Sequence, residues 1–268
     1  MRQLILDQKV NKDGLVRVSG KDYRYLRQVL RAKVGDMISI RLPDEVLYNS
    51  TVAEIDDKNK WITLQVCAGT QKEDSEKSIT RGVQAQQIEL NQNNIEYTLF
   101  QFIPRPQKFE QIVRQATECG IKYIVPVIGQ YSEKSSVEAL GKSKQDRINR
   151  IVKEARQQSG SPVETKVMEQ VSLETAIQNW KKQNEQISGV GFVLSERDDG
   201  NQDIRSILKD KKYVRIGIVV GSEGGISPDE INVLTKDNLF YPIHFSVNIL
   251  RCETAALYGI AAVQTAVE

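Results

Sequence analysis

A glycine-rich loop between a predicted strand and a predicted helix is the stretch of this sequence best suited to hold a ligand. The apolar run 214–220 is typical of a buried strand, and the loop 221–225 that follows it holds three glycines and one acid. Ser227, Pro228 and Glu230 then have the types and spacing of a helix start, because Ser-x-x-Glu forms a capping box and proline fits a first turn. Backbone amides approach a ligand closely where no side chain intervenes. The strand, loop and helix start together predict a ligand cradle.

The loop does not have the form of the common phosphate-binding motifs. Neither Gly-x-x-x-x-Gly-Lys-Ser/Thr nor Gly-x-Gly-x-x-Gly fits it. Glu223 lies inside the loop, where its carboxylate would repel a pyrophosphate. A cofactor that combines a nucleoside with a cationic centre, such as S-adenosylmethionine, would not meet this repulsion. The structural alternative is that Gly221, Gly224 and Gly225 only shape a tight turn before the helix.

Residues 1–70 predict a small, mostly β domain with one helix. Short β-prone runs bounded by Asp, Asn, Gly or Lys cover residues 4–6, 15–18, 37–42, 46–55 and 61–66. Helical spacing from Asp22 to Arg31 places four apolar residues on one side: Tyr23, Leu26, Val29 and Leu30.

Three basic residues, Arg24, Arg27 and Arg31, fall on another side of this predicted helix, about one per turn. Residues 21–41 carry six basic and two acidic side chains, although the whole chain has a net charge of only +2. Phosphate contacts need such local clustering. The arginine ridge is therefore either an RNA-binding surface or a solvated helix face.

A polar stretch at 71–86 has almost no apolar residue and predicts a linker. From 87 to 268 strands and helices alternate, which indicates an α/β domain. The strands are expected at 95–103, 123–128, 189–194, 213–220 and 238–245. The helices are expected at 106–119, 145–158, 172–182 and 253–266, with a further helix opening at Pro228. Small residues in the last helix allow another helix or backbone segment to approach it closely, either in a dimer interface or in a tight core.

The composition, with 40% hydrophobic and 27% charged residues, is typical of a soluble globular protein. The N-terminus lacks a signal peptide, and no apolar run approaches the roughly 18 residues of a membrane span. Cys67, Cys119 and Cys252 are isolated, which suits a reducing cytoplasm and gives no metal-ligand spacing, so we expect no metal. The one histidine, His244, is interpreted as a packed or exposed strand residue.

Two late segments carry a resemblance to a known family. GSEGGISPDE at 221–230 and NILRCETAALYGIAAVQ at 248–264 resemble a cofactor loop and the knotted C-terminal loop and helix of bacterial 16S ribosomal RNA uridine-N3 methyltransferases. These enzymes belong to the trefoil-knotted (SPOUT) methyltransferase superfamily. Residues 104–110, Glu118-Cys119-Gly120-Ile121 and 154–160 resemble further family segments in the same order. The likeness spans essentially the whole chain.

The resemblance implies a knotted α/β methyltransferase domain behind a PUA-like RNA-binding β-barrel, in a homodimer that acts on 16S ribosomal RNA. It implies S-adenosylmethionine as cofactor, with backbone groups of Ile249 and Leu250 holding adenine. The implied cofactor-binding residues are Leu194, Ser195, Val220, Gly221, Glu223, Gly224, Gly225, Asn248, Ile249 and Leu250. The resemblance implies three walls of the site: the glycine loop, the segment 248–251, and the strand end Leu194-Ser195-Glu196. Arg105 and Lys108 open a helix near this site, and are either grips for RNA phosphates or plain surface charges.

Arg251 is the candidate catalytic residue for that reaction. Uridine N3 carries a proton and a delocalised lone pair, so it attacks a methyl group poorly. Loss of the proton gives an anion spread over N3 and both carbonyl oxygens. A guanidinium is always charged and offers donors in a fixed plane, which suits it to hold this anion. The alternative is a structural ion pair or a surface charge.

The sequence also departs from the family pattern. Ser222 stands where proline is usual, Phe245-Ser246-Val247-Asn248 replaces Leu-Gly-Pro-Arg, and Cys252 replaces Thr or Ala. Two alternatives therefore stay open. One is a knotted methyltransferase that modifies a different RNA nucleotide or the ribose. The other is a non-catalytic ribosome-assembly factor with a degenerate cofactor pocket, favoured by Ser222, Ser246 and Asn248.

Overall fold

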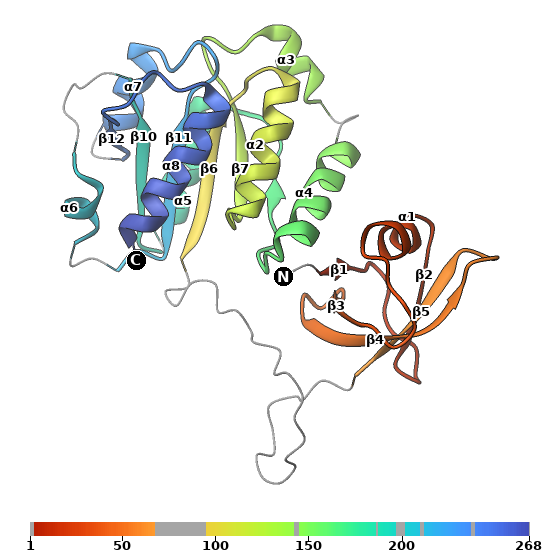
Figure 1. Cartoon of the computed structure of the whole chain (residues 1–268). Helices are drawn as coiled ribbons and strands as arrows, with labels where there is room; N and C mark the ends of the chain where they lie inside the picture. Colours follow the sequence, from red (N-terminus) through yellow and green to blue (C-terminus); the bar gives the residue numbers. More distant parts are fainter. Residues whose placement is uncertain are drawn as a thin grey trace. The chain divides into compact units, whose positions relative to one another are not determined.

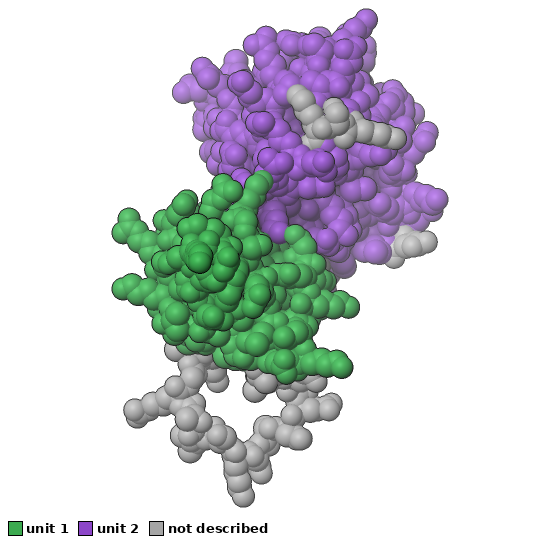
Figure 2. Space-filling view, turned by 90° about the vertical axis from the view of Figure 1, so that its right-hand side faces the viewer, with its two compact units in different colours: residues 1–90, 157–160 green, residues 91–156, 161–268 purple. Residues whose placement is uncertain are grey.

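The chain folds into two compact units, residues 1–90 with 157–160 and residues 91–156 with 161–268 (Figure 2). In this computed structural model the described residues are 3–67, 95–141, 145–185, 187–196, 202–209, 212–236 and 239–267. The predicted linker at 71–86 lies outside these ranges.

The first unit is a curled five-stranded mixed sheet (Figure 1). Its strands are β1 (Leu4–Ile5), β2 (Leu15–Ser19), β3 (Met37–Arg41), β4 (Leu47–Asp56) and β5 (Trp61–Val66), in the order β1-β3-β4-β5-β2. β1 runs parallel to β3, and the other neighbours are antiparallel. The core contains alternate residues of each strand, such as Val16 and Val18 of β2 and Ile62 and Leu64 of β5. β1 and β2 form the two edges, so the predicted barrel is a half-barrel.

The helix of this unit differs from the prediction. It begins as α1 (Gly20–Arg24) and continues as the π-helical turn η1 (Tyr25–Val29), where Leu30 N donates to Tyr25 O at 3.1 Å. A π-helical turn holds more residues than an α-helical turn, so the periodicity of 3.6 fails there. Val29, predicted on the apolar side, is 56% exposed, and that part of the prediction is wrong.

The second unit is a parallel sheet with helices on both faces. Its strands are β6 (Glu96–Phe102), β7 (Tyr123–Ile128), β8 (Lys166–Val167), β9 (Val171–Ser172), β10 (Gly189–Leu194), β11 (Arg215–Val220) and β12 (Tyr241–Ile243). The order is β12-β10-β11-β6-β7-β8, with β9 also on β7. β11 is buried along its whole length, because both faces of the sheet are covered.

Seven helices of the second unit lie within the described ranges. They are α2 (Pro106–Glu118), α3 (Lys134–Ala139), α4 (Gln145–Ser159), α5 (Leu173–Asn184), α6 (Ile204–Leu208), α7 (Pro228–Thr235) and α8 (Cys252–Val267). α2 and α8 pack together on one face and α5 lies behind the sheet (Figure 1). The short elements α3, α6, β8 and β9 were not predicted from the sequence. Of the helices that the structure describes, none is both long and apolar enough to cross a membrane.

The face behind the sheet contains an aromatic cluster. Phe100, Trp180 and Phe240 lie with ring centroids 5.5 to 5.8 Å apart. Gly191 of β10 faces this cluster, and a Cβ there would lie 2.1 Å from Cδ1 of Phe240. The ring can occupy this place only because residue 191 has no side chain.

We expect Gly191→Ala to lower the free energy of unfolding by about 1–3 kcal/mol, because the added methyl overpacks the cluster. Denaturant unfolding of the purified protein measures this change. The double variant Gly191→Ala/Phe240→Leu gives the alanine room, so its cost should be less than the sum of the two single costs. Strict additivity of the two changes would contradict this packing argument.

Candidate active site

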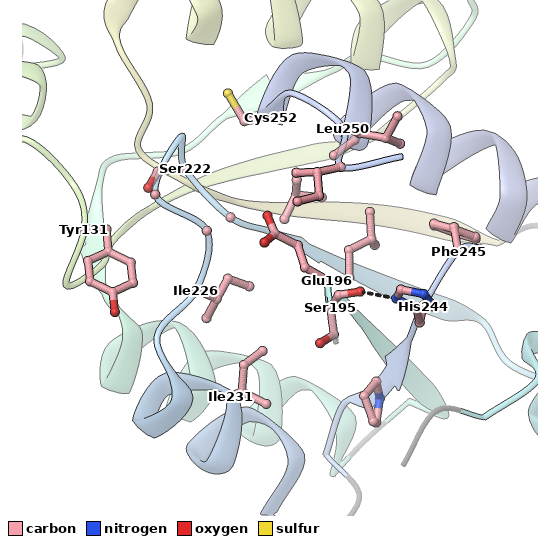
Figure 3. Close-up of a pocket in the computed structure, with 18 of the residues that line it drawn as sticks. Tyr131, Ser195, Glu196, Ser222, Ile226, Ile231, His244, Phe245, Leu250 and Cys252 are labelled. Atoms are coloured by element: carbon pink, nitrogen blue, oxygen red, sulfur yellow. Dashed lines mark hydrogen bonds between the residues drawn. The ribbon is translucent and has the colours of Figure 1, made fainter. Parts of the chain in front are cut away.

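A cavity of about 470 Å³ lies at the carboxyl ends of β10, β11 and β12 (Figure 3). These strands are neighbours and run parallel, so the segments that follow them meet at one edge of the sheet. The cavity is lined by Tyr131, Leu194, Ser195, Glu196, Val220, Gly221, Ser222, Gly224, Gly225, Ile226, Pro228, Ile231, Asn232, Thr235, Pro242, His244, Phe245, Val247, Asn248, Ile249, Leu250, Cys252 and Ala255. Of the ten residues predicted to bind cofactor, all but Glu223 are in this lining.

The glycine loop after β11 is closed on itself. Gly225 N donates to Ser222 O at 3.0 Å, and Gly225 has φ of +77°. A Cβ at Gly221 would lie 2.7 Å from the carbonyl carbon of Gly225. The loop can close this tightly only with glycine at position 221, and its backbone therefore forms a wall of the cavity.

Hydrogen bonds fix both ends of this loop. Gln101 Nε2, which is buried in β6, donates to Gly221 O at 2.9 Å. At the other end the predicted capping box of α7 is confirmed: Glu230 N donates to Ser227 Oγ at 3.3 Å, and Ser227 N donates to Glu230 Oε2 at 2.9 Å. Glu230 Oε1 also accepts from Gln130 N at 2.7 Å, which ties the segment after β7 to α7. The cavity wall is thus held at several points.

Tyr131 and His244 are among the lining residues that the sequence analysis did not assign to the site. Tyr131 follows β7, and a Cβ at Gly224 would lie 2.8 Å from the Tyr131 Cβ, so the two segments touch. His244, interpreted as a strand residue, follows the end of β12 and faces Ser195, with 3.1 Å between its Nδ1 and the Ser195 carbonyl oxygen (Figure 3). Neither residue belongs to a motif with a recognisable spacing, so only the strand order places them.

Glu223 points to a charged cluster instead of the cavity. Its Oε1 accepts from Arg105 N at 3.1 Å and lies 3.7 Å from Lys108 Nζ. Lys108 Nζ is also 3.2 Å from Oε2 of Glu253, in the first turn of α8. Arg105 pairs with Glu133 at 3.1 Å. Lys108 therefore joins the glycine loop to the start of α8.

These pairs change the protonation equilibria at the start of α8. Burial opposes the charge of Lys108, but the hydrogen bond to Glu253 and the nearby acids raise the pKa of Lys108 above its usual value. Burial, a hydrogen bond to Glu253 and the charge of Glu223 raise the pKa of the Cys252 thiol to about 12. Cys252 is therefore a thiol at neutral pH and not a thiolate nucleophile.

Arg251 lies between two residues of the lining, Leu250 and Cys252, but its own side chain is exposed and is not part of the lining. Within the described ranges it has no hydrogen bond or ion pair from its guanidinium. Arg251 is thus an exposed cation without a described partner, next in the sequence to two residues that line the cavity.

The three arginines of the first unit are not equivalent. Arg27 donates from Nε and Nη2 to the carboxylate of Asp57 at 2.9 and 2.8 Å, and this pairing lowers the pKa of Asp57. Arg24 and Arg31 have exposed side chains with no such pairing among the described residues. Arg31 has a positive φ of 55°, so it lies beyond the helical turn and not on a continued ridge.

Comparison with known proteins agrees with this architecture. Residues 91–264 match the model of the RNA methyltransferase domain family. Ribosomal RNA small subunit methyltransferase E 2 of Borreliella burgdorferi is 26% identical over 97% of this chain and 96% of its own length. The corresponding methyltransferase E of Rickettsia conorii is 26% identical over 90% of this chain and 85% of its own length.

A solved structure has the same fold. Ribosomal RNA small subunit methyltransferase E of Neisseria gonorrhoeae, bound to S-adenosylmethionine, matches 99% of this chain and 97% of its own chain with a TM-score of 0.71 and 21% identity. The threading of the C-terminal segment through an earlier loop stays a prediction. The chain belongs to the RNA methyltransferase family, in the group of the ribosomal RNA small subunit methyltransferases E.

Proposed function

We propose that this protein transfers the methyl group of S-adenosylmethionine to N3 of a uridine in 16S ribosomal RNA. The observation that carries the proposal is the cavity at the ends of β10, β11 and β12, which is lined by the glycine loop and by the segments 194–196 and 247–250. Its volume of about 470 Å³ falls within the range usual for small-molecule sites. The relatives from Borreliella burgdorferi and Rickettsia conorii are methyltransferases of small-subunit ribosomal RNA, which supports this substrate.

In this proposal the cofactor supplies an activated methyl group, and the chain supplies position and charge. The glycine loop and the segment 248–250 both line the cavity, and the backbone of Ile249 and Leu250 would hold the adenine. The N3–methyl bond forms as the sulfur–methyl bond breaks, and the N3 proton leaves to solvent or to a base. Arg251 stabilises the uracil anion from outside the cavity.

Further parts of the proposal concern the RNA and the assembly. Arg24 and Arg31 of the first unit are exposed and suited to phosphate contacts, whereas Arg27 is held by Asp57.

The last helix, α8, has one side that faces its own chain and one that is exposed. Gly259 packs on Leu194 of the same chain, so the small residue at this position lets α8 pack closely on its own core. The opposite side of α8 exposes Thr254, Tyr258, Ala261 and Thr265, and we assign this face to a homodimer contact. The reaction would take place in the cytoplasm, where ribosomal subunits assemble.

Calorimetry with S-adenosylmethionine, together with mass spectrometry of 16S ribosomal RNA from a deletion strain, tests this function. We expect saturable binding and the loss of one N3-methyluridine that the reintroduced gene restores. Absent binding with unchanged RNA masses would favour the assembly factor. Binding with the loss of a different methylated nucleotide would assign another target.

Arg251→Ala should lower the single-turnover rate of RNA methylation by about 100- to 1,000-fold, because the ionised uracil loses its cation. Affinity for S-adenosylmethionine should stay within about threefold, since the Arg251 side chain does not line the cavity. Arg251→Lys keeps a charge but loses the planar donors, so its rate should be intermediate. An unchanged rate in a folded Arg251→Ala protein would remove Arg251 from the mechanism.

Lys108→Met should weaken binding of S-adenosylmethionine by about 3- to 10-fold, because Glu223 and Glu253 lose the cation that joins the loop to α8. Calorimetry measures the change. Lys122→Met is the matched control, because Lys122 forms an ion pair with Glu96 near the amino ends of β6 and β7, away from the cavity. Equal affinity of both variants and the wild type would show that the loop does not depend on Lys108.

A further inference from the structure

Glu196 is the only residue with a formal charge at neutral pH among the described residues that line the cavity. It follows the end of β10, and its carboxylate points toward the glycine loop (Figure 3). Its Oε1 lies 3.8 Å from the position that a Cβ would take at Gly225. A negative charge therefore stands beside the backbone wall of the cavity.

This carboxylate differs from the other acids of the region. Glu223 and Glu253 both pair with Lys108 outside the lining, and Glu230 is used in the cap of α7. Within the described ranges, no hydrogen bond or ion pair joins the Glu196 carboxylate to another residue. The charge is thus not neutralised by a described neighbour, and it favours a cationic ligand.

We propose that Glu196 selects the charged methyl donor over its neutral product. The inference rests on the proposed function. S-adenosylmethionine carries a sulfonium cation, and S-adenosylhomocysteine carries a neutral thioether. When the methyl passes from sulfur to N3, the electron pair of the broken bond stays on sulfur and the sulfonium charge disappears. The attraction of Glu196 then disappears as well, which favours release of the product and entry of a new donor.

The discrimination comes from a charge and not from a hydrogen bond. Glutamine has nearly the shape of glutamate and keeps an acceptor oxygen, but it carries no charge. Glu196→Gln therefore separates a role toward the sulfonium from a role toward the ribose hydroxyls, which donor and product share. The side chain is exposed and has no described partner, so the substitution should leave folding intact, as a thermal melt will verify.

The experiment is calorimetry of the full chain with three ligands: S-adenosylmethionine, S-adenosylhomocysteine and sinefungin. Sinefungin carries an amine near the position of the sulfonium, so it is a cationic analogue. We expect Glu196→Gln to weaken binding of the two cationic ligands by about tenfold and to leave S-adenosylhomocysteine within about twofold. The matched control is Glu164→Gln, which removes an exposed acid paired with Lys166 outside the lining and should change none of the three affinities.

The outcomes separate this inference from the proposed function. Equal weakening of all three ligands would assign Glu196 to a group shared by donor and product, and would overturn charge selection. Unchanged affinities in Glu196→Gln would also overturn it, while leaving the methyltransferase proposal intact. A wild-type protein that binds none of the three ligands would overturn both.

Discussion

The candidate site depends on a constraint of chain path: three consecutive strands end around the cavity, and their order in the sheet, β12-β10-β11, differs from their order in the sequence. The chain leaves β11 through α7 and returns as β12 on the far side of β10. Their carboxyl ends therefore bring three loops to one edge of the sheet. A side chain does not fit at Gly221, where the glycine loop closes on its own Gly225, or at Gly224, which lies against Tyr131 after β7. In the same way α8 packs on Leu194 at Gly259. The cavity is what this close backbone packing leaves open.

The charges around this edge are sorted by position. Acids outside the lining are paired, with Lys108 between Glu223 and Glu253. Inside the lining Glu196 carries the charge, and beside it the exposed Arg251 carries the opposite one. In the proposed reaction the sulfonium of the donor would face the Glu196 carboxylate, and the ionised uracil would face the Arg251 guanidinium. The sulfonium and the uracil both become neutral when the methyl group is transferred. Glu196 and Arg251 would therefore both act on the transfer step.

The sequence predicted the elements whose stability is local or strongly periodic. The capping box of α7 and the buried run of β11 follow from a few neighbouring residues, and the structure has them at the predicted places. Sequence periodicity failed at Val29, where a π-helical turn replaces the α-helical one. It also said nothing about the partners of Lys108 or the contact of His244 with Ser195, because those depend on which strands become neighbours. The resemblance to a known family indicated which segments form the walls of the cavity. It did not indicate the ion pairs of Lys108 beside the cavity.

The departures from the family pattern bear on whether the cavity can work. In a degenerate pocket, the side chains at the altered positions would fill the cavity. Those of Ser222 and Phe245 do not fill it. The Ser222 hydroxyl is buried within the loop, and Phe245 packs edge-on against Tyr258 with ring centroids 4.8 Å apart. The thiol of Cys252 is likewise buried at the start of α8 and stays protonated. Ser222, Phe245 and Cys252 thus pack into the walls, whereas Ser246, Val247 and Asn248 are exposed, and a cavity of about 470 Å³ stays open. The geometry is that of a pocket able to hold a small molecule and not of a pocket that has closed.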